Sequence, residues 1–572
     1  MSSVSCHTLW PTIGLARFFE FGVGTHRRAA VLLLLASLIS FLPGFFQIAP
    51  IDRDEPRYAE ATKEMIQTGD YVDIRFHGKA KNDKPIGIYW LQAVAVKTGA
   101  ILGVPHALST IWLYRLPSLL GAIGAVLGSY WCALAFVNRR GATLAGLMMV
   151  ASVLLGVEAR IATIDAMLLC MVVFAIGALA RVYLQARQEK ASRPSFGLLA
   201  IFWTTLALGV LLKGLAILLV VGLTSITLSI FDRSLRWLFA LRPMPGTAWA
   251  ALLVLPWLIA ISLHRGDAFL TSSVGHDTLG KLVMSQEGHG KLPGFYLLLY
   301  FVTFFPGSIL TAMAAPAIIT QWREPAIRFL LAWLVPSWIV FELAVTKLPH
   351  YVLPLYPAVA ILFAIVIDRD MLSQRIWLKR GAIWWFLTPL IVSVLAVLGA
   401  IVIGREPVFS AWPFLAAAIL CGLLAWKSYQ DEGAEQALIC AMAASVLISV
   451  GVGGFIVPSL SSLFPSPALA RVLRNSGCAH PVVVSAGYEE PSLRFLTGTF
   501  AQLTDADGAT AADHLRQGGC RFALIEKRQE PDFAARAAAI GLHYDRRASV
   551  AAFNLGHVQQ VDISVFQSEA SP

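Results

Sequence analysis

Long stretches of apolar residues, separated by short polar segments, make up most of the chain up to residue 457. A helix needs about 20 mostly apolar residues to cross the hydrocarbon core of a bilayer. The first stretch is too long for the apolar part of a signal peptide and has no small-residue cleavage site after it, so we interpret it as an uncleaved anchor. The pattern predicts thirteen membrane-spanning helices, over residues 29–49, 116–137, 141–157, 163–183, 196–212, 214–230, 247–263, 294–320, 326–345, 351–367, 381–403, 411–427 and 434–457.

The composition agrees with a membrane protein and excludes several other classes. Of 572 residues, 57% are hydrophobic and 14% are charged, whereas an average soluble domain has about 25% charged residues. A soluble enzyme and a disordered protein are therefore excluded. The seven cysteines form no CxxC pair and no metal-finger spacing, so a disulfide scaffold is excluded as well.

The basic residues predict how the chain is oriented in the membrane. The net charge is +10, but the basic residues form short clusters between apolar stretches, which argues against nucleic-acid binding. Such clusters are typical of cytoplasmic loops. The N-terminus is therefore predicted to be cytoplasmic, and an odd number of spans places the C-terminus outside. The clusters are Arg27 and Arg28; Arg139 and Arg140; Arg187, Lys190 and Arg193; Arg233, Arg236 and Arg242; Arg323 and Arg328; and Arg369, Arg375, Lys379 and Arg380. The short loops on the opposite side have one basic residue each, namely Arg160, Lys213, Lys347 and Arg405.

Three segments are predicted to lie outside the membrane on the outward side. Two are the long loops 51–115 and 264–293, and within the first an apolar stretch over 86–102 is predicted to lie at the interface. The third is the tail 458–572, where short β-rich runs (482–485, 521–526 and 561–566) alternate with alanine-rich helical runs (509–517 and 533–540). We expect a transmembrane domain over 1–457 and a small soluble α/β domain over 458–572.

The first outward loop has an unusual density of charge beside the membrane. It begins with the sequence IDRDEPRYAE over residues 51–60, and Lys79, Lys81, Asp83 and Lys84 follow. These carboxylates could act as bases or metal ligands, and these cations could bind a phosphate. A solvated loop with surface ion pairs is the alternative.

Six segments resemble those of known enzymes. They are DEPRYAEATKEMIQTGDYV (54–72), NDKPIGIYWLQA (82–93), RIATIDAML (160–168), ALGVLLKG (207–214), KLPHYVLP (347–354) and AGYEEPSLRFLTG (486–498). In this order they resemble integral-membrane glycosyltransferases of the GT-C type, more specifically the bacterial lipid A aminoarabinose transferases and more loosely the protein O-mannosyltransferases. The resemblance implies an α-helical polytopic fold with a small C-terminal α/β domain.

The resemblance also implies an activity, a location and partners. Such enzymes, in the bacterial inner membrane, take a sugar from a polyprenyl (undecaprenyl) phosphate and transfer it with inversion to an acceptor at the outer face. Lipid A or another glycolipid is the expected acceptor and protein the alternative, while aminoarabinose, a uronic acid, mannose and galactose all remain compatible as the sugar. A membrane transporter is the alternative from another class, but its charges should lie near the bilayer midplane.

Family motifs assign roles to three carboxylates. Asp54 matches the carboxylate at the reaction centre and is expected to act as general base or to orient the acceptor, although it could instead cap a helix before Pro56. Its neighbour Glu55 is a further candidate. Asp165 matches the second acidic position, and Arg160 is close enough in sequence to be its partner.

The remaining candidates bind the donor phosphate or a metal. Arg57, Lys84 and Lys281 correspond to the family's cationic site, and Lys347 and Tyr351 are expected to contact the phosphate too; interfacial snorkelling is the alternative for the cations. Asp83 and His276, with His289 as another possibility, suggest a tentative divalent metal site, for zinc or magnesium. No organic cofactor is expected.

Overall fold

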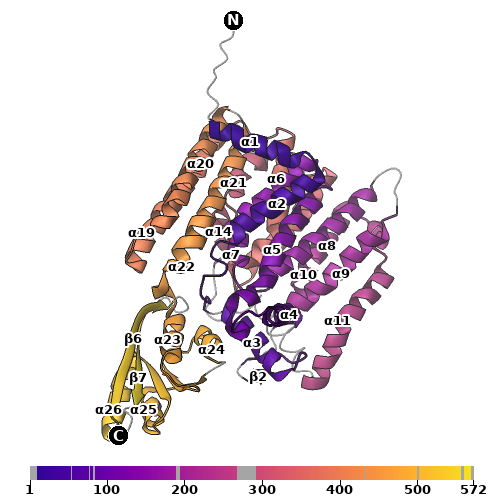
Figure 1. Ribbon diagram of the computed structural model, residues 1–572. Helices are drawn as coiled ribbons and strands as arrows, with labels where there is room; N and C mark the ends of the chain where they lie inside the picture. The colour runs from indigo at the N-terminus through magenta and orange to yellow at the C-terminus, as the bar shows by residue number, and fades with distance from the viewer. Residues whose placement is uncertain are drawn as a thin grey trace.

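The computed structural model describes residues 10–52, 54–76, 78–80, 84–187, 193–266, 292–431, 433–498, 501–554 and 559–568. Long apolar helices run side by side, and a small sheet domain lies at one end of the bundle, far from the N-terminus (Figure 1). The bundle helices are α1 (Trp10–Val23), α2 (His26–Phe41), α5 (Ile111–Ala133), α6 (Arg139–Ala151), α7 (Val153–Glu158), α8 (Asp165–Gln185), α9 (Phe196–Lys213), α10 (Leu215–Asp232), α11 (Pro243–Arg265), α14 (Phe295–Thr303), α15 (Thr311–Thr320), α16 (Pro325–Leu343), α17 (Tyr356–Asp368), α18 (Ile376–Lys379), α19 (Trp384–Gly404), α20 (Trp412–Asp431), α21 (Ala434–Ile448) and α22 (Val457–Ser459).

These helices confirm a multi-pass membrane protein but not the number of spans. Among the described residues, ten helices are long and apolar enough to cross a membrane. The number is eleven if the pair Phe295–Thr303 and Gly307–Thr320, bent by 117°, is one span. The two other predicted spans coincide with α2 and with α6 followed by α7, which are too short for that test. The predicted total of thirteen therefore exceeds what length and composition support.

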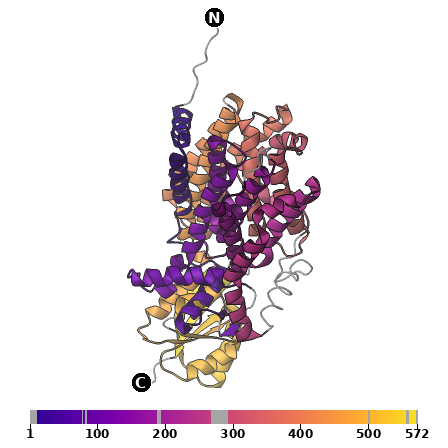
Figure 2. The ribbon, with the colours of Figure 1, turned by 90° about the vertical axis from the view of Figure 1, so that its right-hand side faces the viewer.

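Two helices of the first predicted outward loop pack together beside the bundle. They are α3 (Asp54–Thr68) and α4 (Gly87–Ile101), with the short strands β1 (Arg75–Phe76) and β2 (Lys79–Ala80) between them. The Thr62 hydroxyl donates a buried hydrogen bond of 2.7 Å to Gln92 Oε1 and so joins the two helices. Helix α4 runs across the direction of the long helices (Figure 2) and is not among the candidate spans. This placement agrees with an interfacial helix.

The C-terminal residues form an α/β unit around a five-stranded sheet. Its strands are β3 (Val482–Ala486), β4 (Gln502–Ala506), β5 (Arg521–Glu526), β6 (Tyr544–Asn554) and β7 (Gln559–Ser568), in the order β4-β3-β5-β7-β6. β3 is parallel to β4 and β5, whereas β7 is antiparallel to β5 and β6. The helices are α23 (Pro465–Arg474), α24 (Pro491–Thr497), α25 (Gly508–Arg516) and α26 (Glu530–Ala539). The three predicted β-rich runs coincide with β3, β5 and β7, and the two predicted helical runs with α25 and α26, whereas β4, β6, α23 and α24 were not predicted.

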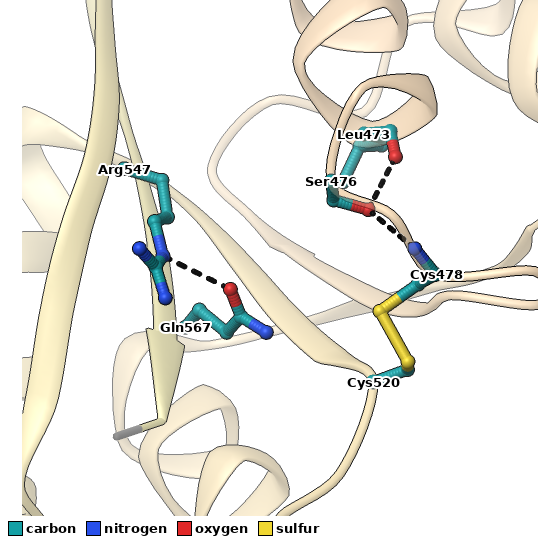
Figure 3. The surroundings of a disulfide bond; sticks show 6 residues. All are labelled: Leu473, Ser476, Cys478, Cys520, Arg547 and Gln567. Carbon is teal, nitrogen blue, oxygen red and sulfur yellow. Dashed lines mark hydrogen bonds between the residues drawn. A yellow bond between two sulfur atoms is a disulfide. The ribbon is translucent and has the colours of Figure 1, made fainter. Parts of the chain in front are cut away.

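A disulfide joins the segments that lead into two neighbouring strands of this sheet. Cys478 precedes β3 and Cys520 precedes β5 (Figure 3). Ser476 Oγ accepts a hydrogen bond from the Cys478 amide at 3.4 Å and donates one to the Leu473 carbonyl at 2.6 Å. The cysteine spacing did not predict this pairing, because the two residues become neighbours only when β3 and β5 align.

Candidate active site

Two buried carboxylates face a histidine at one end of the bundle. Glu158 is the last residue of α7 and Asp165 the first of α8, so a tight connection of six residues holds them near each other. His350 comes from the 3₁₀ helix Pro349–Leu355. Its Nδ1 lies 3.5 Å from Glu158 Oε1, and its Nε2 lies 3.6 Å from Asp165 Oδ2. The Thr163 hydroxyl donates to Glu158 Oε2 at 2.8 Å, so the second oxygen of Glu158 is satisfied.

The cation that pairs with Asp165 is Lys213, the last residue of α9. Its ammonium forms an ion pair with Asp165 Oδ1 and lies 5.1 Å from the centroid of the Tyr351 ring. The sequence offered one signal for Lys213, its place in the segment ALGVLLKG, but assigned it no role. Glu158 and His350 were missed altogether, although His350 lies in the segment KLPHYVLP.

The expectation that Arg160 pairs with Asp165 is wrong. The Arg160 guanidinium is directed at the backbone, where it donates to the carbonyls of Pro43, Gly156 and Ser40. It also donates to Ser449 Oγ at 2.9 Å. Arg160 therefore ties the end of α2 to a distant part of the bundle, while Asp165 pairs with Lys213.

Asp54 and Lys84 lie in the same neighbourhood as this cluster. Asp54 is the exposed first residue of α3, and Lys84 is half-buried just before α4. Both are near enough to act electrostatically on His350; Asp54 also acts on Glu158, and Lys84 on Asp165. The structure thus brings Asp54, Lys84 and Asp165 together from three separate segments.

The carboxylate of Glu55 is engaged in a buried ion pair. Its carboxylate accepts from Arg115 Nε at 2.7 Å and Nη2 at 2.9 Å, and from the amides of Ile51 and Ala162 at 2.8 Å each. The side chain of Glu55 is 2% exposed and that of Arg115 is 0% exposed. Because both oxygens are engaged, this geometry indicates a structural role, and we do not retain Glu55 among the groups proposed to contact substrate.

The other predicted residues are placed as follows. Arg57 is half-buried on α3, and Tyr351 is half-buried beside Lys213. Lys347 is buried, and its ammonium donates to the Ala344 carbonyl at 2.6 Å. The remaining four, Asp83, His276, Lys281 and His289, lie outside the described residues.

The C-terminal unit packs against α3, the helix that begins with Asp54. Asp52 accepts a hydrogen bond of 3.1 Å from the Ser492 amide of α24. The buried ammonium of Lys63 donates to the Phe495 carbonyl at 3.0 Å and pairs with Glu60 at 3.3 Å, and burial lowers the pKa of Lys63. The Phe495 ring meets the Tyr114 ring edge to face at 5.2 Å. These contacts couple the tail to the helix that carries the candidate base.

Asp52 should make the stability of this contact depend on pH. Its pKa is raised from 3.8 to about 7, chiefly by burial and also by nearby Glu490 and Glu55, while the hydrogen bonds from Ser492 oppose the shift. Because the folded-state pKa is the higher one, this stabilisation is complete below pH 3.8 and is lost as the pH rises to about 7. Asp52→Asn should therefore flatten the fall in thermal unfolding temperature between about pH 5 and pH 7. Parallel profiles for the wild type and this variant, with exposed Asp545→Asn as control, would contradict the assignment.

The triad of Glu158, Asp165 and His350 could hold a metal ion. One ligand atom from each residue lies within 4.8 Å of the other two. Three protein ligands that leave a position open are typical of catalytic zinc sites. The Lys213 ammonium occupies the other oxygen of Asp165, so the oxygen facing His350 is the one that an ion would contact.

Comparisons with known proteins agree with the fold and with the motifs. A family model described as dolichyl-phosphate-mannose-protein mannosyltransferase matches residues 49–265. The crystal structure of ArnT from Cupriavidus metallidurans bound to undecaprenyl phosphate matches with a TM-score of 0.71 at 19% identity, over 93% of this chain and 97% of that chain. The chain therefore has the fold of this crystal structure, and residues 49–265 are similar to this glycosyltransferase family.

The chain is also similar in sequence to undecaprenyl phosphate-alpha-4-amino-4-deoxy-L-arabinose arabinosyl transferases. It is 27% identical to the enzyme of Pseudomonas aeruginosa (strain LESB58) over 68% of this chain and 70% of that protein. It is 26% identical to the enzyme of Yersinia enterocolitica over 59% of this chain and 58% of that protein. The match thus spans less than two thirds of the Yersinia enzyme.

Proposed function

We propose that this chain transfers a sugar from undecaprenyl phosphate to lipid A, with inversion, at the outer face of the bacterial inner membrane. The observation that carries the proposal is the shared neighbourhood of Asp54, Lys84 and Asp165 at the end of the bundle where the C-terminal unit packs. The undecaprenyl phosphate in the names of the similar enzymes, and in the similar crystal structure, supports this donor.

The residues suit a displacement at the anomeric carbon of the donor sugar. An acceptor oxygen attacks the anomeric carbon, and the bond from that carbon to the carrier phosphate breaks, so that the phosphate leaves with the bonding electrons. Asp54 takes the acceptor's proton or orients its oxygen. Lys84 and Arg57 stabilise the charge that develops on the leaving phosphate. Asp165, which forms an ion pair with Lys213, lies in the same neighbourhood as Asp54 and Lys84. Tyr351 and Lys347 lie on the loop beside Lys213.

Two observations support an outward position for this site. The cationic clusters lie in the loops at the opposite end of the bundle, as the rule for cytoplasmic loops requires. The tail contains the Cys478–Cys520 disulfide, and disulfides persist mainly in oxidising compartments such as the periplasm. Residues 458–572 are therefore proposed as a periplasmic domain.

A protein acceptor is the second candidate. The family model that matches residues 49–265 describes a protein mannosyltransferase, which favours this alternative. We prefer lipid A because the segment AGYEEPSLRFLTG, in the C-terminal unit, resembles the aminoarabinose transferases. The arrangement of charges at one end of the bundle does not favour a transporter.

A divalent ion at Glu158, Asp165 and His350 is part of the proposal, with zinc preferred to magnesium. An imidazole nitrogen beside two carboxylates is a zinc donor set, whereas magnesium prefers oxygen ligands and water. Such an ion would add positive charge beside the leaving phosphate.

Lipid A mass spectra from cells with and without this chain test the proposed function. We expect one additional mass, equal to a single sugar residue, only when the intact chain is expressed. The same cells would show that mass on an exported protein if the acceptor is protein. Identical lipid A and protein spectra in both strains would contradict the assignment as a transferase.

A further inference from the structure

A cavity of about 730 Å³ lies at the end of the bundle opposite the candidate active site. Helix α8 begins at Asp165 and ends at Gln185, and its 21 residues separate the two sites by about 30 Å. The cavity is also lined by the end of α10 and by the 3₁₀ helix Arg236–Leu241. We call it the arginine cavity, because Arg187, Arg193, Arg236 and Arg242 line it together with one acidic residue, Asp232.

The acidic residue of this cavity is already neutralised. Asp232 forms ion pairs with Arg187 and, at 2.9 Å, with Arg328 from α16. Arg193, Arg236 and Arg242 have no acidic partner among the residues that the structure describes. The cavity therefore carries an excess of positive charge on guanidinium groups, which can form bidentate hydrogen bonds with phosphate oxygens.

A buried donor without a partner lines the same cavity. Trp237 is 8% exposed, and within the described part of the chain its indole Nε1 has no hydrogen-bond acceptor. Leaving a buried N–H unpaired is unfavourable, so an acceptor that enters the cavity would satisfy it. Gln185 Oε1, also unpaired, could accept from a hydroxyl of the same ligand.

The surface beside the arginines is apolar. Leu235 is 61% exposed and Phe239 71% exposed, on either side of the buried Trp237. Exposed apolar side chains next to arginines at the end of a helical bundle are typical of a lipid–water boundary. A soluble phosphate compound would leave these apolar side chains exposed, whereas the acyl chains of a phospholipid would cover them.

We propose that the arginine cavity binds the headgroup of an anionic phospholipid with a hydroxylated head, such as phosphatidylglycerol. The phosphate contacts Arg193, Arg236 and Arg242 and accepts from Trp237 Nε1. A headgroup hydroxyl donates to Gln185, and the acyl chains lie along Leu235 and Phe239. This site is separate from the donor site and does not depend on the proposed reaction.

Native mass spectrometry of the full-length protein in detergent tests the site. Titration with phosphatidylglycerol should give binding about tenfold tighter than titration with phosphatidylcholine. Arg236→Gln with Arg242→Gln should weaken phosphatidylglycerol binding roughly tenfold, and Trp237→Phe should weaken it several-fold. The matched control Arg375→Gln with Arg380→Gln removes the same charge from an exposed loop and should leave binding unchanged.

Three results would overturn the proposal. They are equal binding of the two lipids, equal losses in the two double variants, and displacement of phosphatidylglycerol by millimolar inorganic phosphate, which would assign the cavity to a soluble anion. Thermal unfolding temperatures show whether each variant is folded. If the double variant is not, the single change Arg193→Gln, at an exposed loop position, provides the same test.

Discussion

Asp54→Asn should lower sugar transfer by about 10² to 10⁴-fold, the usual contribution of a general base. The amide keeps the size of the side chain and its place at the start of α3 but cannot accept the acceptor's proton. Because Asp54 is exposed, the change should leave the thermal unfolding temperature almost unchanged. Membranes that contain the variant, incubated with a labelled lipid-linked sugar and an acceptor, give the rate.

The control for this experiment is Glu406→Gln, which removes a carboxylate from an exposed position on the same predicted outward side. Its transfer rate should equal that of the wild type. If Asp54→Asn also transfers at the wild-type rate, Asp54 is not the base. A lower rate that follows only from a raised KM would indicate that Asp54 orients the acceptor and takes no proton.

Glu55→Gln should destabilise the protein by about 3–5 kcal/mol, because it leaves the buried guanidinium of Arg115 without its counter-charge. Arg115 would keep its hydrogen bonds to the carbonyls of Phe45, Ile48 and Ala49, but these carry no full negative charge. The thermal unfolding temperature of the purified protein in detergent should therefore fall clearly. The same loss should appear as a lower yield of folded protein in membranes.

A double variant separates this structural role from a catalytic one. Replacing both partners by apolar residues, as in Glu55→Leu with Arg115→Met, is often nearly neutral, so the double variant should regain most of the lost stability. A stable but inactive Glu55→Gln protein would contradict our reading and return Glu55 to the catalytic residues. Activity per folded molecule, measured for the single and double variants, distinguishes these cases.

The sequence predicted those parts of the site that depend on local pattern. Asp54 and Asp165 were identified because their segments resemble motifs of known enzymes, and each is a carboxylate beside an apolar stretch on the side that the charged loops predict to be outward. In the C-terminal unit, β3, β5 and β7 are apolar enough to be predicted, whereas β4 and β6 are largely exposed and were missed.

Partnerships between distant residues could not be predicted from sequence. Arg160 precedes Asp165 by only five residues, yet its side chain is directed toward the carbonyls of another segment. Lys213, 48 residues away, becomes the partner because α9 runs antiparallel to α8 and ends beside its first residue. Glu55 and Arg115 meet for a similar reason, across 60 residues.

The hydrophobic pattern was sufficient to establish that the chain spans a membrane many times and that a small α/β unit follows, and the basic residues predict which loops face the cytoplasm. The stability of an apolar segment in the bilayer and the cost of moving a charged loop across it depend on the residues of that segment and of its flanking loops. Both can therefore be judged from the sequence. Which carboxylate meets which cation, the placing of His350 between two acids, and the gathering of arginines around one cavity were decided only by tertiary packing. Those contacts depend on how helices distant in sequence align, and a charged group taken out of water is stable only where that alignment supplies its partner.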